Sequence, residues 1–165
     1  MEKLQSFHSL FLHELQDLYS AEVQMVESLP KMIRAAAYAE LQNAFQNHYE
    51  ETRQQLTRLQ RVFAMLGVDP GTEPCLGVQG LIREATEILQ STADPSVKDA
   101  ALISVAQKIE HYEIASYGTI CTWAKLLDYD DALDLLKETV DEEKKADEKL
   151  SDIAKDTINQ AAALH

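Results

Sequence analysis

The sequence predicts an all-α fold, an up-and-down bundle of four long helices with one long crossover that carries a short extra helix. Apolar residues recur at steps of three and four through four long segments, which is the period of helices with one buried face. The chain has only 5 Gly and 4 Pro among 165 residues, too few for a turn-rich all-β fold. Two of the connections between the long segments are very short, which predicts two antiparallel helix pairs.

The first two helices are expected over residues 4–38 and 41–66, with a link near Ala39 and Glu40. A link this short leaves the chain no room to cross the bundle, so the second helix returns beside the first. Apolar residues at heptad spacing mark the buried line of each helix. These are Phe11, Leu15, Leu18, Met25, Leu29, Met32 and Ala36 on the first helix, and Leu41, Phe45, Leu59, Val62 and Leu66 on the second.

The long connection starts at Gly67 and leads through Pro-containing sequence into a short helix expected over 78–90. Asp94 followed by Pro95 is a good N-cap and first-turn pair. The third long helix is therefore expected over 95–127.

The fourth long helix is expected over 130–163 and runs antiparallel to the third, because the link at 128–129 is short. A four-helix bundle with one long crossover has the ferritin-like connectivity. We expect residues 1–165 to form a single domain of this kind. The buried lines are Ile103, Ala106, Tyr117, Ile120, Ala124 and Leu127 on the third helix, and Leu136, Val140, Leu150 and Ala154 on the fourth.

The chain is strongly acidic, with 15 Lys and Arg against 28 Asp and Glu and a net charge of -13. This balance disfavours nucleic acid and anionic membranes as partners but suits cations. No apolar run is long enough to span a bilayer, and residues 1–6 show no secretory signal. Two cysteines make no disulfide framework, and Cys75 is expected to be more accessible than Cys121. We expect a cytoplasmic protein with no nucleic-acid or membrane partner.

Acidic residues interrupt the buried line of every long helix near its middle. Buried carboxylates must be protonated or matched by cations, and no Lys or Arg lies on these lines at the same level. Two metal ions would match them, and carboxylates with a minority of imidazole on facing helices are the ligands of di-iron and di-manganese bundles. The candidate metal ligands are Glu22, His48, Glu51, Glu110, Glu113, Glu143 and Asp147.

Other interpretations of the same positions stay open. The acidic residues could form a solvated polar seam, and Glu142 would replace Glu143 as a ligand if the helical phase differs by one residue. Thr52 and Gln55 border the site and could orient ligands. Tyr117 could hydrogen-bond a ligand or simply fill the core with a satisfied hydroxyl.

Four segments around the candidate ligands are distinctive: LYSAE at 18–22, HYEET at 48–52, QKIEHYEIASY at 107–117 and LKETVDEEK at 136–144. They resemble the YciF/YciE family of bacterial stress-associated ferritin-like proteins, and the likeness extends over nearly the whole chain. The resemblance implies a ferritin-like bundle that is often dimeric, with a dinuclear metal centre, in the bacterial cytoplasm under stress. It implies no particular reaction.

The ligand pattern departs from that of many ferritin-like enzymes, which carry Glu-x-x-His on the second and fourth helices. Here the second helix has the reverse order, His48-x-x-Glu51, and the fourth offers Glu143 and Asp147 without a His. The pair Glu110 and Glu113 resembles rubrerythrins, in which the extra carboxylate belongs to peroxide chemistry. The bridging ligands and the oxidant therefore stay open.

The leading hypothesis is a redox metalloprotein, a di-iron oxidoreductase or peroxidase that acts on oxygen or peroxide, with manganese as the alternative metal. Iron binding without turnover is a second hypothesis, although storage needs a cage of many subunits and we expect a homodimer. A third is a non-catalytic bundle that binds partners and holds at most a structural metal ion.

Overall fold

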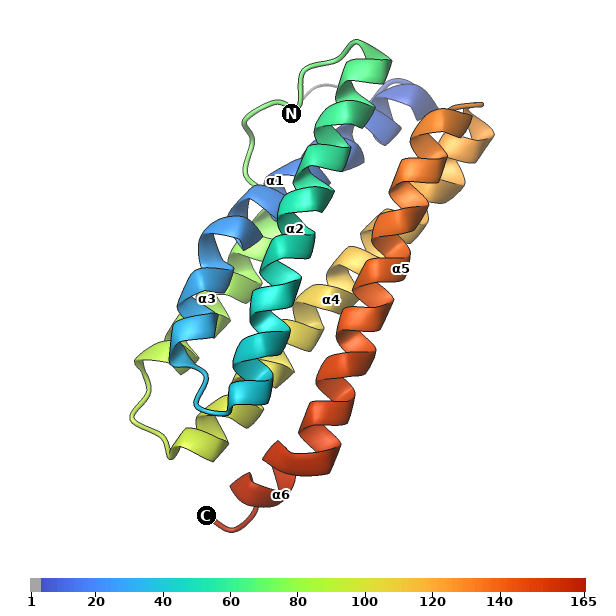
Figure 1. The fold of residues 1–165 in the computed structure, drawn as a ribbon. Coiled ribbons are helices and arrows are strands. Elements are labelled where there is room, and N and C mark those ends of the chain that lie inside the picture. The colour runs from blue at the N-terminus through green and yellow to red at the C-terminus, as the bar shows by residue number, and fades with distance from the viewer. Residues whose placement is uncertain (1–3) are drawn as a thin grey trace.

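The computed structural model describes residues 4–165, and helices are the only regular elements in that part of the chain (Figure 1). The expected bundle with one long crossover is confirmed. We expected a single domain over residues 1–165 and no secretory signal in residues 1–6. Both expectations include residues 1–3, which lie outside the described part of the chain. The long helices are α1 (Phe7–Ala35), α2 (Ala39–Leu66), α4 (Pro95–Leu126) and α5 (Asp130–Ile153), and the short elements are α3 (Leu76–Gln90), the π-helical turn η1 (Ala154–Ile158) and α6 (Asn159–Ala162).

The first helix begins at Phe7, later than expected, because Ser6 caps it. The Ser6 hydroxyl accepts the backbone N–H of Ser9 at 3.0 Å, and the Ser9 hydroxyl in turn accepts the N–H of Ser6. This reciprocal capping box satisfies donors that the first helical turn leaves free. The helix ends at Ala35, and α2 starts at Ala39 after a link of three residues.

The link between α1 and α2 is held by Asp99, a residue that the sequence did not single out. Asp99 is fully buried in α4, and its carboxylate accepts the backbone N–H groups of Ala37 at 3.0 Å and Tyr38 at 2.8 Å. This side chain therefore secures the turn of the first hairpin to the second hairpin.

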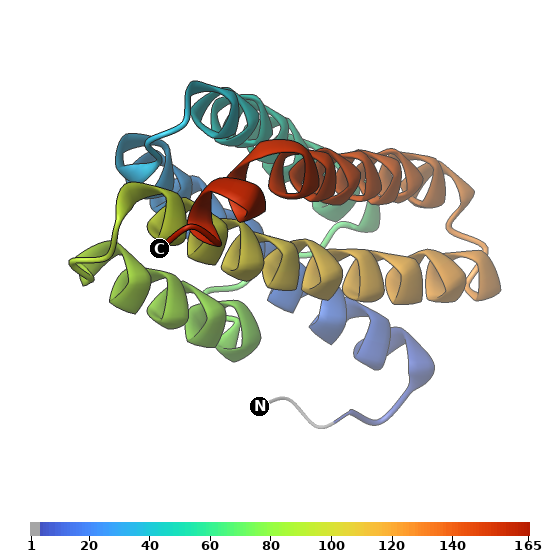
Figure 2. The same cartoon turned by 90° about the horizontal axis from the view of Figure 1, so that it is seen from below.

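The crossover helix α3 packs against α1 and α4 on the outside of the bundle (Figure 2). Its N-cap is Cys75, whose sulfur accepts the N–H of Val78 at 3.5 Å. Cys75 is fully buried, whereas Cys121 is only partly buried. The prediction that Cys75 is the more accessible of the two cysteines was therefore wrong. The Tyr112 hydroxyl lies 3.1 Å from the Cys75 sulfur and donates to Asp17 at 2.7 Å, which closes the seam between α3, α4 and α1.

Two apolar clusters fill the bundle, one towards each end. One contains Met25, Phe45 and Leu150, and the other contains Phe11, Phe63 and Leu136. Between them lies a polar layer formed by Glu22, His48, Glu110, Glu113 and Glu143, all buried. None of the helices in residues 4–165 combines the length and the apolar character that a membrane span requires.

Candidate metal centre

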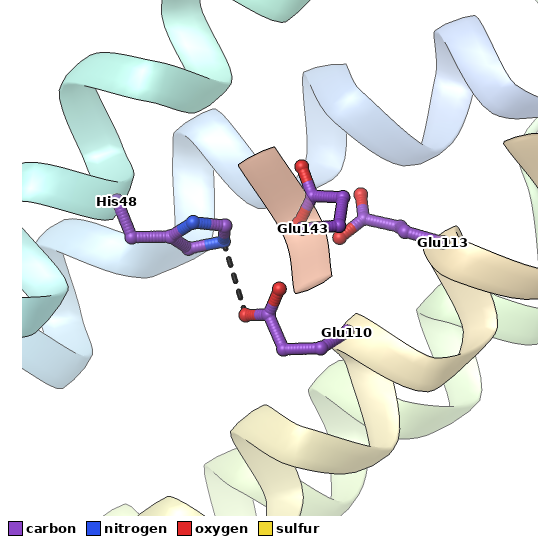
Figure 3. A group of neighbouring side chains, drawn as sticks. All are labelled: His48, Glu110, Glu113 and Glu143. Atoms are coloured by element: carbon purple, nitrogen blue, oxygen red, sulfur yellow. Dashed lines mark ion pairs between the residues drawn. The ribbon is translucent and has the colours of Figure 1, made fainter. Parts of the chain in front are cut away.

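Four buried side chains of the polar layer meet at one point inside the bundle (Figure 3). They are His48 from α2, Glu110 and Glu113 from α4, and Glu143 from α5. One nitrogen or oxygen from each lies within 4.8 Å of the others, and we refer to them as the four-residue cluster. The Nε2 atom of His48 is 3.2 Å from Oε1 of Glu110.

Helical periodicity explains why two of these residues come from one helix. Glu110 and Glu113 are three residues apart on α4, so they share one face of the helix. Both residues are 1% exposed, and Glu143 is completely buried on the facing helix. The cluster thus lies where three helices turn their buried faces to one another.

The electrostatics of the cluster are unfavourable without a cation. Burial raises the pKa of Glu110 well above its ordinary value, and the charge of Glu143 raises it further. Burial and Glu143 likewise raise the pKa of Glu113. Burial alone would lower the pKa of His48, but Glu51 and Glu143 outweigh it and raise that pKa. Glu110 and Glu113 therefore resist ionisation, first because they are buried and second because the neighbouring Glu143 is also an acid.

Several polar atoms of the layer have no hydrogen-bond partner within residues 4–165. They are Oε2 of Glu22, both ring nitrogens of His48, Oε2 of Glu110, Oε1 of Glu113 and both carboxylate oxygens of Glu143. Buried polar atoms are rarely left without hydrogen-bond partners. This concentration of oxygen and nitrogen atoms without such partners therefore fits the coordination of a bound cation.

Glu22 brings the first helix to the same layer. It is completely buried, and its Oε1 atom accepts a hydrogen bond of 2.5 Å from the Tyr117 hydroxyl. Burial and the nearby Glu143 raise the pKa of Glu22, although the hydrogen bond from Tyr117 opposes this shift. The structure therefore brings Glu22 next to the four-residue cluster. One of its carboxylate oxygens is hydrogen-bonded to Tyr117, and the other has no hydrogen-bond partner in the described chain.

The two remaining candidate ligands lie at the edge of the layer. The side chain of Glu51 is 45% exposed, and one of its oxygens is 3.9 Å from Nδ1 of His48. Asp147 is 21% exposed and accepts a hydrogen bond of 3.0 Å from Gln107. Neither belongs to the four-residue cluster.

Arg58 is the residue near the site that the sequence pattern missed. Its guanidinium binds both oxygens of Glu142 at 2.9 Å and also lies 3.1 Å from Glu138. Arg58 directly precedes Leu59 on the buried line, and its long side chain reaches across to α5. Glu142 is therefore paired outside the layer, and Glu143 is the residue that points inward.

Three polar residues beside the layer, Thr139, Gln55 and Thr52, have hydrogen-bond partners of their own. Thr139 lies on the buried face in place of the expected Val140, and its hydroxyl accepts a hydrogen bond of 2.8 Å from Arg58. Gln55 is buried and donates to Glu142 at 3.1 Å. Thr52 donates to the backbone carbonyl of His48 at 2.8 Å, within its own helix.

These features define an all-helical bundle protein with a buried cluster of carboxylates and one imidazole that could hold a metal ion. The chain belongs to the family described as a domain of unknown function, DUF892, whose model matches residues 6–163. It is 44% identical over 160 residues to protein YciF of Escherichia coli strain K12, covering 96% of each chain. The resemblance to YciF is thus confirmed.

Solved structures of similar proteins have the same fold. The crystal structure of the E. coli stress protein YciF matches with a TM-score of 0.91 and 45% identity, over 94% of this chain and 98% of that one. YcfI of Rhodopseudomonas palustris, described as a candidate structural protein, matches with a TM-score of 0.88 and 43% identity, over 92% and 96% of the two chains. A Xanthomonas campestris protein at 21% identity and a TM-score of 0.73 shares the fold.

Proposed function

We propose that the polar layer holds a dinuclear metal centre, with iron as the metal and manganese as the alternative, and that the protein is a redox or iron-handling protein of the bacterial stress response. The observation that carries this proposal is the four-residue cluster, in which buried donor atoms face one another without hydrogen-bond partners in the described chain.

The kind of donor atom supports the metal. The cluster offers three carboxylates and one imidazole on facing helices, and this set suits iron or manganese. A structural zinc site would more commonly contain thiolates. A pair of iron ions would supply one-electron redox chemistry toward oxygen or peroxide.

Charge balance supports two ions rather than one. Glu22, Glu110, Glu113 and Glu143 are buried carboxylates from three helices, and two divalent cations would match their negative charges. Tyr117 would hold one oxygen of Glu22 in place, which leaves the other oxygen to a metal ion. Glu51 would become a further ligand after a rotation of its side chain, whereas Asp147 would contribute only if it exchanged its bond from Gln107.

A stress role is supported by the description of the E. coli relative as a stress protein. We also propose a cytoplasmic homodimer in which residues 1–165 form one domain. A non-catalytic structural bundle is the second candidate function, and the description of the R. palustris relative favours it.

Metal content tests the proposal directly. We expect the protein, purified without chelators or affinity nickel, to contain about two iron or manganese ions per chain. Glu110→Gln and Glu143→Gln should each lose most of this metal, whereas Glu148→Gln, an exposed residue of α5, should retain it. Elemental analysis provides the count.

Two further results would decide between the candidate functions. Absence of stoichiometric metal, together with no uptake of ferrous iron under anaerobic conditions, would contradict the metal centre. Metal that binds but is not oxidised by oxygen or peroxide, as followed by visible absorbance, would favour the structural bundle.

A further inference from the structure

A cavity of about 520 Å³ lies beside the polar layer, between the first half of α2 and the second half of α5. Buried apolar side chains from four helices form its inner wall, among them Met25, Phe45, Ala106 and Leu150. The outer part of this space opens to solvent between exposed residues of α2 and α5, and its inner part extends to side chains of the apolar core.

The cavity reaches the candidate metal centre at its inner end. His48 and Glu110, two members of the four-residue cluster, line it there. His48 is only 6% exposed, and neither of its ring nitrogens has a hydrogen-bond partner in the described chain. A molecule in the cavity would therefore lie directly against two of the proposed metal ligands.

The mouth of the cavity carries charges of both signs. Glu40 of α2 and Lys149 of α5 are exposed, line the cavity, and form an ion pair of 3.2 Å across the opening. Lys145 and Glu51 add one further charge of each sign. Because these charges balance, the mouth selects neither anions nor cations.

Water does not suit the inner part of this space. An ordered water needs two to four polar partners, and the inner wall is apolar apart from His48 and Glu110. The volume falls in the range of roughly 300–1,000 Å³ that is typical of small-molecule sites. These sites are mostly apolar with a few polar groups, as here.

We propose that this cavity binds an uncharged, apolar organic molecule and places its inner end beside the metal centre. The role of that molecule as a substrate rests on the function proposed above, whereas its binding requires only the cavity. The occupant is a small molecule rather than a second copy of the chain, because the ion pair of Glu40 with Lys149 bridges α2 and α5 over this space and the apolar wall consists of buried side chains.

The probe for the binding test is N-phenyl-1-naphthylamine, an uncharged aromatic amine that fluoresces in apolar surroundings. We expect saturable binding of one probe per chain to the metal-free protein. Ala44→Leu and Ala146→Leu add side-chain volume to half-buried positions in the cavity wall and should weaken binding by about tenfold or more. Ala64→Leu, an exposed position of α2 outside the cavity, is the matched control and should bind as the wild type does.

Thermal melts establish that the variants are folded, and native mass measures their oligomeric state. Equal probe affinity in the wild type and the filled variants would overturn the inference, because the probe would then bind elsewhere. The inference would also be overturned if the wild type bound no probe and Ala44→Leu or Ala146→Leu changed the native mass. That result would indicate that a second copy of the chain occupies the cavity.

Metal uptake separates this inference from the proposed function. Probe binding by a protein that takes up no metal would contradict the metal centre and leave the cavity as a ligand site. Metal uptake without saturable probe binding would overturn the cavity inference alone. If the protein both takes up metal and binds the probe, adding the probe to the Co²⁺-loaded protein should change the visible absorption spectrum of the cobalt, since His48 and Glu110 line the cavity.

Discussion

The hydroxyl of Tyr117 contacts the polar layer from the side of the second apolar cluster. Tyr117 is fully buried, and its hydrogen bond to Glu22 spans two helices, α4 and α1. Burial raises the pKa of Tyr117, and the charge of Glu22 raises it further, so the hydroxyl keeps its proton and acts as a donor. This one side chain determines which oxygen of Glu22 is free.

Tyr117→Phe should weaken metal binding by about tenfold or more while the ring volume is kept, because residues that orient metal ligands commonly contribute this much. The variant leaves Oε1 of the buried Glu22 without its donor, which should cost the metal-free protein roughly 1–3 kcal/mol of unfolding free energy. Metal titration and urea unfolding measure the two effects. Tyr129→Phe removes a hydroxyl that bonds the exposed His8, and it should leave metal affinity unchanged. Equal metal affinity in all three proteins would contradict the orienting role.

At the scale of the helices, the position of α3 depends on a close approach to α4. A Cβ atom at Gly77 would lie 2.7 Å from the ring of Tyr112, closer than such contacts occur in proteins. Gly77 therefore lets the first turn of α3 lie against the tyrosine that also contacts Cys75 and Asp17.

Two glycines of the same helix provide a matched test of this packing. Gly77→Ala should lower the unfolding free energy by roughly 1–3 kcal/mol, because the ring of Tyr112 or the helix must shift. Gly80→Ala, with no atom within 4 Å of its added Cβ, should raise it by up to about 1 kcal/mol through better helix propensity. Chemical unfolding measures both. The same sign for the two variants would show that the close approach does not limit the packing of α3.

For the molecule as a whole, the polar layer divides the core into two apolar clusters and concentrates buried acids between them. The folded, metal-free protein holds protons on Glu22, Glu110 and Glu113 more tightly than the unfolded chain, because burial and mutual repulsion raise their pKa values. The contribution of these protonated carboxyl groups to the free energy of unfolding is complete at a pH below the ordinary carboxyl pKa. This contribution is lost as the pH rises through the raised pKa values of the folded protein.

The metal-free protein should therefore become less stable as the pH rises from about 4.5 towards neutrality, in contrast to proteins with paired surface carboxylates. Each tenfold increase in proton affinity on folding contributes roughly 1.4 kcal/mol to this change. Urea unfolding in EDTA across the pH range measures it. Glu110→Gln should flatten the dependence, whereas Glu148→Gln, which removes an exposed charge, should not. Stability that increases with pH in the wild type would contradict the assignment of these acids to a buried layer.

Much of the fold and of the candidate site could be predicted from local periodicity. Heptad spacing places Glu22, Glu110 and Glu113 on the same faces as neighbouring apolar residues, and those faces are buried in the structure. The period also distinguishes Glu143 from Glu142 by about 100°, and the structure places Glu143 inside. It was less reliable at the edge of the faces, where Glu51 and Asp147 remain partly exposed.

Local pattern in the sequence thus accounts for the helices, their order and the acids on their buried faces, because each depends on residues close together in the chain. The bidentate pairing of Arg58 with Glu142 and the contact of Asp99 with the first link join residues more than sixty positions apart or on different helices. The cavity likewise depends on how far α2 stands from α5. These features follow from the rotation and separation of packed helices, which no short stretch of sequence encodes.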